Sequence, residues 1–141
     1  MSDLQPLIEA MNDQLSAEYQ AVIMYIHYAA VVVGPHRPEL SGFFTREIAE
    51  ETLHAQYLAD KVSALGGTPT TTAKPVPHST DAKQLLENVV AAEIEAVTAY
   101  ANIIRLADEV GEVGIRVQAE NFLMDESHHR DETKKILQSW R

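Results

Sequence analysis

Apolar residues recur at intervals of three and four along four long stretches of the chain. This spacing places apolar side chains on one face of an α-helix and leaves polar residues on the others. The first stretch covers about residues 4–33 and is followed by Gly34 and Pro35, which end helices. The other three cover about 39–65, 81–109 and 113–138. We therefore predict an all-α protein in which four apolar faces share one core.

The apolar positions of these stretches are expected to point into that core. They include Ile26 in the first stretch and Leu53 in the second. The methionines Met11, Met24 and Met124 follow the same pattern, so we interpret them as core residues and not as ligands.

Residues 66–80 interrupt the helical pattern. They contain Pro69, Pro75 and Pro77 and show no apolar periodicity, which indicates an extended connector. Fifteen extended residues reach roughly 45 Å, enough to run back along a long helix. The other two connections are short and predict antiparallel hairpins. The sequence thus predicts a single domain over residues 1–141, a four-helix bundle of two hairpins joined by a long crossover.

Charge and composition exclude several classes of function. The chain has 11 basic against 21 acidic residues, a net charge of −10, which argues against nucleic-acid binding. It has no cysteine, so disulfides, zinc ribbons and iron–sulfur clusters are excluded within this chain. No signal peptide is recognised and no apolar run is long enough to span a membrane. We expect a cytoplasmic protein that does not bind membranes.

Acidic and histidine residues repeat at a fixed offset of 75 positions. The pairs are Glu18 with Glu93, Glu51 with Glu126, and His54 with His129. Glu51 and His54 are three residues apart, as are Glu126 and His129, so each pair offers an oxygen and a nitrogen on one helix face. Each Glu-x-x-His motif is weak evidence alone. The shared offset is more specific, and it indicates that the two halves are copies of one helical hairpin.

Four carboxylates and two imidazoles from four helices are the donor set of di-iron and di-manganese carboxylate bundles. Donors of this hardness suit Fe or Mn, and Zn is possible. We predict that the six residues bind two metal ions about 3.5–4 Å apart. Any one of these acids could instead lie on an exposed helix face or in an ion pair. Burying the four acids and two histidines together without a cation would be very costly.

Further residues are placed to support this site. Asp125 and Glu50 each precede a motif glutamate, and we predict that Asp125 orients His54 and Glu50 orients His129, although both acids could face solvent instead. Glu47 could supply an auxiliary carboxylate.

Two tyrosines, Tyr25 and Tyr100, also obey the offset of 75 and lie seven residues after Glu18 and Glu93. They are the candidate catalytic residues, each expected to hydrogen-bond the glutamate of the opposite half. A core role and an electron-donating role are equally open. The remaining histidines, His27, His36, His78 and His128, lack partners at ligand spacing, so surface or packing roles are expected.

Four segments carry a family resemblance, residues 15–21, 50–55, 65–69 and 125–129. Through them the whole chain resembles the ferritin-like superfamily and is most similar to bacterioferritins. The resemblance implies a ferroxidase that oxidises Fe(II) with O2 or peroxide at a di-iron centre within each subunit. It also implies a hollow homo-oligomer that stores the ferric product.

The chain departs from bacterioferritins in two places. Thr52 stands where they carry a haem-ligating methionine, so we predict no haem. Their short fifth helix is missing before Arg141, which leaves a 12-subunit shell or a simple dimer open beside a 24-subunit cage.

Two other functions stay open. One is a rubrerythrin-like peroxidase or small di-iron oxidase without storage, although the rubredoxin part of rubrerythrins would require cysteine. The other is a non-enzymatic helical module with a structural metal site.

Overall fold

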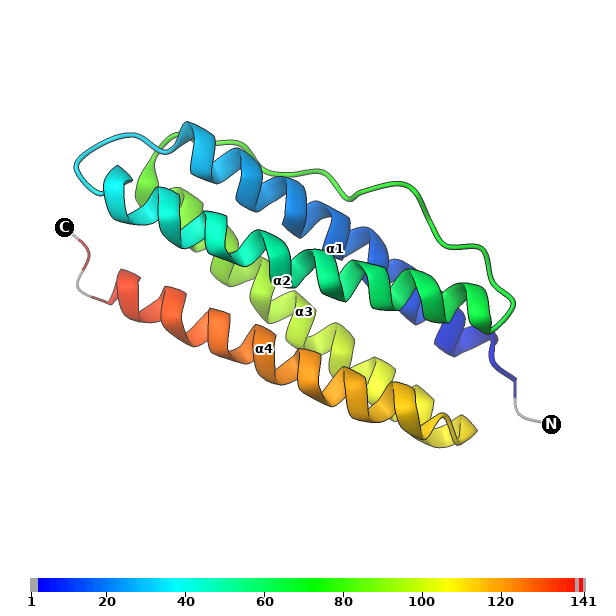
Figure 1. Cartoon of the computed structure of the whole chain (residues 1–141). Helices are drawn as coiled ribbons and strands as arrows, with labels where there is room; N and C mark the ends of the chain where they lie inside the picture. Colours follow the sequence, from blue (N-terminus) through cyan, green and yellow to red (C-terminus); the bar gives the residue numbers. More distant parts are fainter. Residues whose placement is uncertain (1–2, 139, 141) are drawn as a thin grey trace.

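The computed structural model describes residues 3–138 and residue 140. Its four helices are α1 (Gln5–Val31), α2 (Arg37–Ala64), α3 (Ala82–Val110) and α4 (Val113–Leu137). α1 packs antiparallel against α2, α3 packs antiparallel against α4, and α1 also contacts α3 (Figure 1). The predicted all-α four-helix bundle is therefore confirmed.

The helix ends have local causes. α1 ends at Val31 because Val32 is extended, with φ −58° and ψ 131°, and the Val33 amide donates to the Thr80 carbonyl. α2 begins at Arg37, two residues earlier than expected, with Pro38 in the first turn, where its missing N–H costs nothing. Ser139 and Arg141, which follow the predicted fourth helix, lie outside the described residues.

The core divides into two apolar clusters along the bundle. One contains Leu15 of α1, Leu58 of α2 and Ile103 of α3, toward the end of the bundle where the crossover leaves α2. The other contains Tyr28 of α1 and Leu86 of α3. In each helix, the predicted metal-binding residues fall between the segments that build these two clusters. A polar layer therefore crosses the middle of an otherwise apolar core.

Three residues expected in the core lie on the surface. The exposed fractions are 67% for Met124, 62% for Leu53 and 52% for Ile26. Met124 lies two residues after Phe122 and two before Glu126, and successive residues turn by about 100° around a helix. Because both neighbours point inward, Met124 points outward. Leu53 faces outward for the same reason, being two residues after buried Glu51. The buried face of each of these helices is therefore narrower than predicted.

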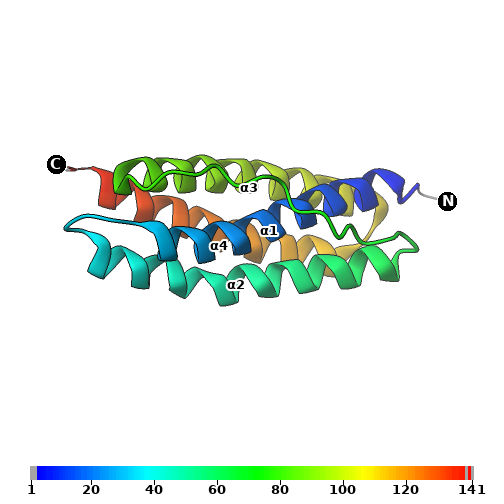
Figure 2. The same cartoon turned by 90° about the horizontal axis from the view of Figure 1, so that it is seen from above.

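The crossover runs along the outside of the bundle beside α1 (Figures 1 and 2). A row of polar side chains on α1 holds it there. Asn12 Nδ2 donates to the Thr68 carbonyl over 2.9 Å, and Asn12 Oδ1 accepts from the Thr70 amide over 2.8 Å. Ser16 Oγ donates to the Thr72 carbonyl over 2.6 Å. Further along, the tyrosine hydroxyl of Tyr28 donates to the Pro77 carbonyl over 2.7 Å.

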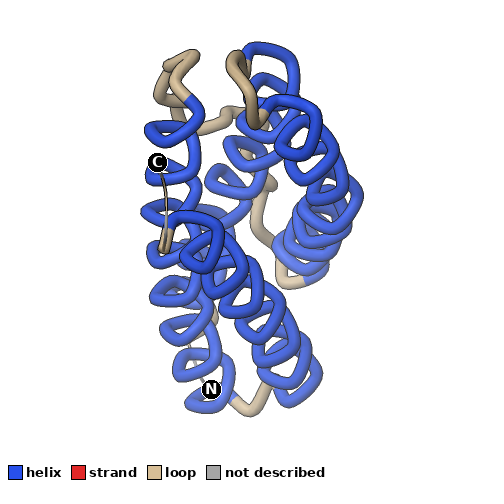
Figure 3. Tube along the Cα trace, turned by 90° about the vertical axis from the view of Figure 1, so that its left-hand side faces the viewer, coloured by secondary structure: helices blue, strands red, loops and turns tan. Residues whose placement is uncertain are grey.

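The connection between α3 and α4 is much shorter than the crossover. Gly111 ends α3 with φ 79°, a left-handed conformation that glycine adopts without strain. Figure 3 shows the bundle from the left-hand side of Figure 1, with foreshortened helices joined by loops. None of the four helices carries an apolar run sufficient for a membrane span.

Candidate metal centre

Six predicted donors meet in the polar layer between the two apolar clusters. They are Glu18 from α1, Glu51 and His54 from α2, Glu93 from α3, and Glu126 and His129 from α4, each no more than 6% exposed. They form two overlapping groups whose ligand atoms lie within 4.8 Å of one another. One group contains Glu18 and His54, the other contains Glu93 and His129, and both contain Glu51 and Glu126. This arrangement suits two adjacent ions that share two carboxylates.

Each of the six side chains has one buried polar atom without a hydrogen-bond partner. These atoms are Glu18 Oε2, Glu51 Oε1, His54 Nδ1, Glu93 Oε2, Glu126 Oε1 and His129 Nδ1. His54 Nδ1 lies 3.0 Å from Glu126 Oε1 but is misaligned for a hydrogen bond. Unsatisfied buried polar atoms are costly and rare in native proteins. Six of them in one place, all of types that bind metal, fit a pair of cations.

The outer nitrogens of the two histidines meet carboxylates across the bundle. His54 Nε2 lies 3.2 Å from Asp125 Oδ2, and His129 Nε2 lies 2.7 Å from Glu50 Oε2. Both predicted contacts are present. Because a carboxylate at Nε2 accepts the ring proton there, Nδ1 of each ring is left for a metal.

Glu47 also reaches His129, with Oε2 2.5 Å from Nε2. Glu47, Glu50 and His129 form a further potential donor group at the edge of the centre, where Glu47 is 15% exposed. The auxiliary role predicted for Glu47 thus has a geometric basis.

The two tyrosines hydrogen-bond across the bundle. Tyr25 Oη donates to Glu93 Oε1 over 2.5 Å, and Tyr100 Oη donates to Glu18 Oε1 over 2.7 Å. Both rings are buried, which together with the nearby carboxylates raises the pKa of each phenol well above its ordinary value. At neutral pH both tyrosines are therefore hydrogen-bond donors to glutamates of the centre.

Burial and neighbouring charges shift the pKa values of several groups in the metal-free centre. Burial, and then the neighbouring carboxylates, raise the pKa of Glu51 well above its usual range. Burial also raises the pKa of Glu93, with Glu126 as the next cause. Burial alone would lower the pKa of His54, but Glu126 and Glu18 outweigh it and raise the pKa to about 10. For His129, burial is likewise outweighed, chiefly by Glu47, and the pKa rises to about 9.

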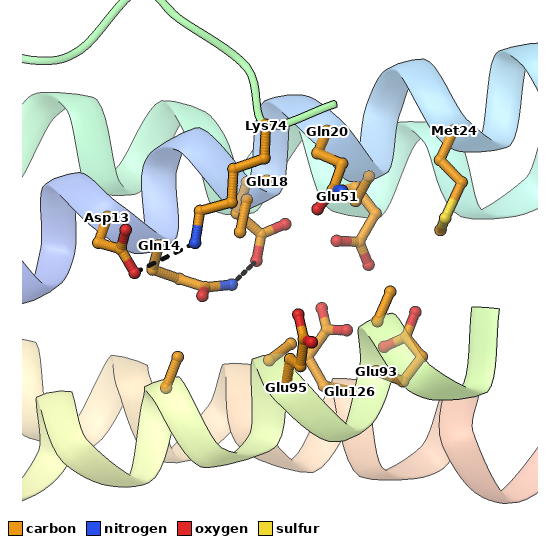
Figure 4. A pocket seen from close by; sticks show the side chains of 15 residues that line it. Asp13, Gln14, Glu18, Gln20, Met24, Glu51, Lys74, Glu93, Glu95 and Glu126 are labelled. Atoms are coloured by element: carbon orange, nitrogen blue, oxygen red, sulfur yellow. Dashed lines mark hydrogen bonds and ion pairs between the residues drawn. The ribbon is translucent and has the colours of Figure 1, made fainter. Parts of the chain in front are cut away.

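A cavity of about 150 Å³ opens from the centre between α1 and α3 (Figure 4). The carboxylates of Glu18, Glu51, Glu93 and Glu126 lie at its inner end. Lys74 of the crossover borders it and pairs with Asp13 over 3.2 Å. The centre is therefore connected to the surface of this chain.

The sequence analysis missed two features of this region. Gln14 lies one turn before Glu18, is buried, and hydrogen-bonds it; its spacing of four from a predicted donor was the available signal. His27 and His78 lack partners at ligand spacing in the sequence, and in the structure His27 Nε2 lies 2.8 Å from His78 Nδ1. That pairing could not be found from spacing, because it depends on the path of the crossover.

Comparison with known proteins places this fold and centre in a family. The ferritin-like domain family matches residues 8–141, and the chain belongs to it. No match is found among curated protein sequences.

Several solved structures are similar over nearly the whole chain. A ferritin-like, diiron-carboxylate protein from Bacillus anthracis str. Ames is 39% identical, with a TM-score of 0.94, over 97% of this chain and 99% of that one. A dodecameric thioferritin, the bacterioferritin-related protein from Bacteroides fragilis, is 27% identical, with a TM-score of 0.88, over 96% and 86%. Dps from Staphylococcus aureus is 20% identical, with a TM-score of 0.90, over the full length of both chains, and shows the fold alone.

Proposed function

We propose that the protein is a di-iron ferroxidase that oxidises Fe(II) with O2 or peroxide and stores or detoxifies the ferric product. The observation that carries this proposal is the convergence of six unpartnered donor atoms in one buried layer. Similarity to a diiron-carboxylate protein supports iron over other metals, although Mn or Zn would also suit these donors.

Each residue of the centre has a role in this proposal. Glu18 with His54, and Glu93 with His129, would each hold one ion, while Glu51 and Glu126 would hold both. These six residues would hold two Fe(II) ions, which would supply the redox chemistry by giving up one electron each to the oxidant. Tyr25 and Tyr100 would hold Glu93 and Glu18 in place through their hydroxyl groups. Asp125 and Glu50 fix the histidine rings. The acid-lined cavity between α1 and α3 provides a path for Fe(II).

We also propose that the chain forms a homo-oligomer. The Bacteroides fragilis relative is dodecameric. On this chain, Tyr19, Val22 and Ile23 of α1 line a mostly apolar groove of about 460 Å³ with Ala55 and Ala59 of α2. Exposed apolar surface of this kind is typical of subunit interfaces.

Iron loading followed by light scattering tests the proposal. Aerobically added Fe(II) should be oxidised rapidly. The mass of the protein in solution should rise by much more than the mass of two metal ions per chain. Peroxide turnover by a dimer that accumulates no iron would favour the oxidase without storage. A protein that binds no metal at all would contradict the proposed centre.

A further inference from the structure

Gln14 distinguishes one half of the centre from the other. Its side chain is 3% exposed, and its Nε2 donates to Glu18 Oε1 over 3.0 Å, as Figure 4 shows. The same oxygen accepts the Tyr100 hydroxyl over 2.7 Å. Two donors therefore hold Oε1, and Glu18 Oε2 is the free atom. Glu18 is fixed in one orientation with one oxygen available to a metal.

The equivalent position in the second half has no such donor. The residue 75 positions after Gln14 is Val89, which is fully buried in an apolar cluster. Glu93, the counterpart of Glu18, accepts a side-chain hydrogen bond from Tyr25 alone among the described residues. Its carboxylate thus has one bond fewer to restrain it.

A second departure from the repeat gives the two histidines different neighbours. Glu47 corresponds to Phe122 at the offset of 75. The Phe122 ring packs on His54, with ring centroids 4.1 Å apart, and helps bury it. On the other side, Glu47 reaches His129 and is partly exposed. The two halves of the centre therefore differ in what packs against each histidine, which is the Phe122 ring at His54 and the Glu47 carboxylate at His129.

We propose that Gln14 is a positioning residue that makes the two metal positions unequal. The position held by Glu18 and His54 fills first, and the position held by Glu93 and His129 fills second and exchanges more readily. The reason is preorganisation: a carboxylate already fixed by two neutral donors loses less freedom when it binds a metal. This inference rests on the proposed metal centre and adds an order of filling to it.

Crystals of the full chain loaded with one equivalent of Co(II) test the order, because Co(II) is not oxidised by air at this kind of site and scatters anomalously. Wild-type protein should show the stronger anomalous peak at Glu18 and His54. A titration should give two dissociation constants that differ by about tenfold, equivalent to about 1.4 kcal/mol and in the range of one hydrogen bond to a charged group.

Two variants and one control isolate the contribution of Gln14. Gln14→Leu should bring the two occupancies close to equality, and Val89→Gln, which offers the matching amide to Glu93, should also narrow the difference. Gln20 lines the same cavity but donates to the Pro75 carbonyl, so Gln20→Leu should leave the order of filling unchanged. Circular dichroism checks each fold, and if Gln14→Leu does not fold, Val89→Gln decides.

The outcomes separate this inference from the proposed function. Equal or reversed filling in the wild-type protein, or an unchanged order in the variants, would overturn the role of Gln14 while leaving the metal centre intact. Wild-type protein that takes up no Co(II) would overturn the centre itself.

Discussion

Glu18 and Glu93 contribute the same chemical group from opposite sides of the bundle. We expect Glu18→Ala and Glu93→Ala each to lower the rate of Fe(II) oxidation by more than about 100-fold, since losing a ligand should exceed the effect of losing a residue behind one. Both variants should fold, because removing one carboxylate relieves repulsion in the metal-free centre. Stopped-flow absorbance and circular dichroism measure the two effects.

Glu95 gives a matched control for this pair. It lies two residues after Glu93 and lines the same cavity, but it is exposed and belongs to neither donor group. Glu95→Ala should therefore oxidise Fe(II) at nearly the wild-type rate. Rapid oxidation by either glutamate variant would place the chemistry elsewhere, and loss of fold in both would make these glutamates structural.

Thr52 determines the expectation about haem. Its Oγ1 donates to the Ile48 carbonyl over 2.7 Å, and a hydroxyl offers no thioether to haem iron. Met24 is buried in an apolar cluster, and Met124 is exposed on α4, so neither replaces it. Protein purified from a haem-replete host should show no Soret absorbance. A Soret band in this protein would contradict the prediction.

At the scale of elements, the contact between the crossover and α1 should contribute to stability independently of the metal. Asn12 makes two hydrogen bonds to the crossover backbone. Asn12→Ala should lower the free energy of unfolding by about 1–2 kcal/mol. Chemical denaturation measures the loss, and Co(II) affinity should stay unchanged. Asn121 is exposed on α4, so Asn121→Ala should have little effect; equal losses in both variants would argue against a specific role for the crossover contact.

The elements and the positions of the six candidate donors were predictable because each depends on spacing within one helix. Glu51 and His54 share a helix face by periodicity alone, and the repeat extended this argument to Glu126 and His129. The His54–Asp125 and His129–Glu50 contacts followed from the same repeat. Which apolar residues of each helix are buried was less predictable. Met124 and Leu53 are apolar but exposed, and hydrophobicity does not reveal how narrow the buried face of each helix is. The His27–His78 contact depends on two segments that only tertiary structure brings together.

At the scale of the whole molecule, metal binding should release protons. His54 and His129, with pKa values of about 10 and about 9, are protonated at pH 7 in the metal-free protein. Metal ligands must be deprotonated, so loading both positions at pH 7 should release at least the two protons of these histidines, and affinity should rise as the pH is raised from 6 to 8. Calorimetry with Co(II) in buffers of different ionisation enthalpy measures the release. A binding heat that is the same in every buffer would contradict it.

The crossover supplies none of the six donors, and each hairpin supplies three of them. Residues 66–80 therefore act as a covalent linker between the two hairpins. Such a linker gives each hairpin an effective concentration of roughly a millimolar around the other. If the chain is cut between Thr71 and Thr72, the two ions become the main link between separate halves. The fragments should associate at micromolar concentration with Co(II) and separate when EDTA removes it, as size-exclusion chromatography would show. Equal association with and without metal would mean that the apolar clusters alone hold the hairpins together. Association that depends on Co(II) would mean that the two hairpins are held together by the metal ions as much as by the linker.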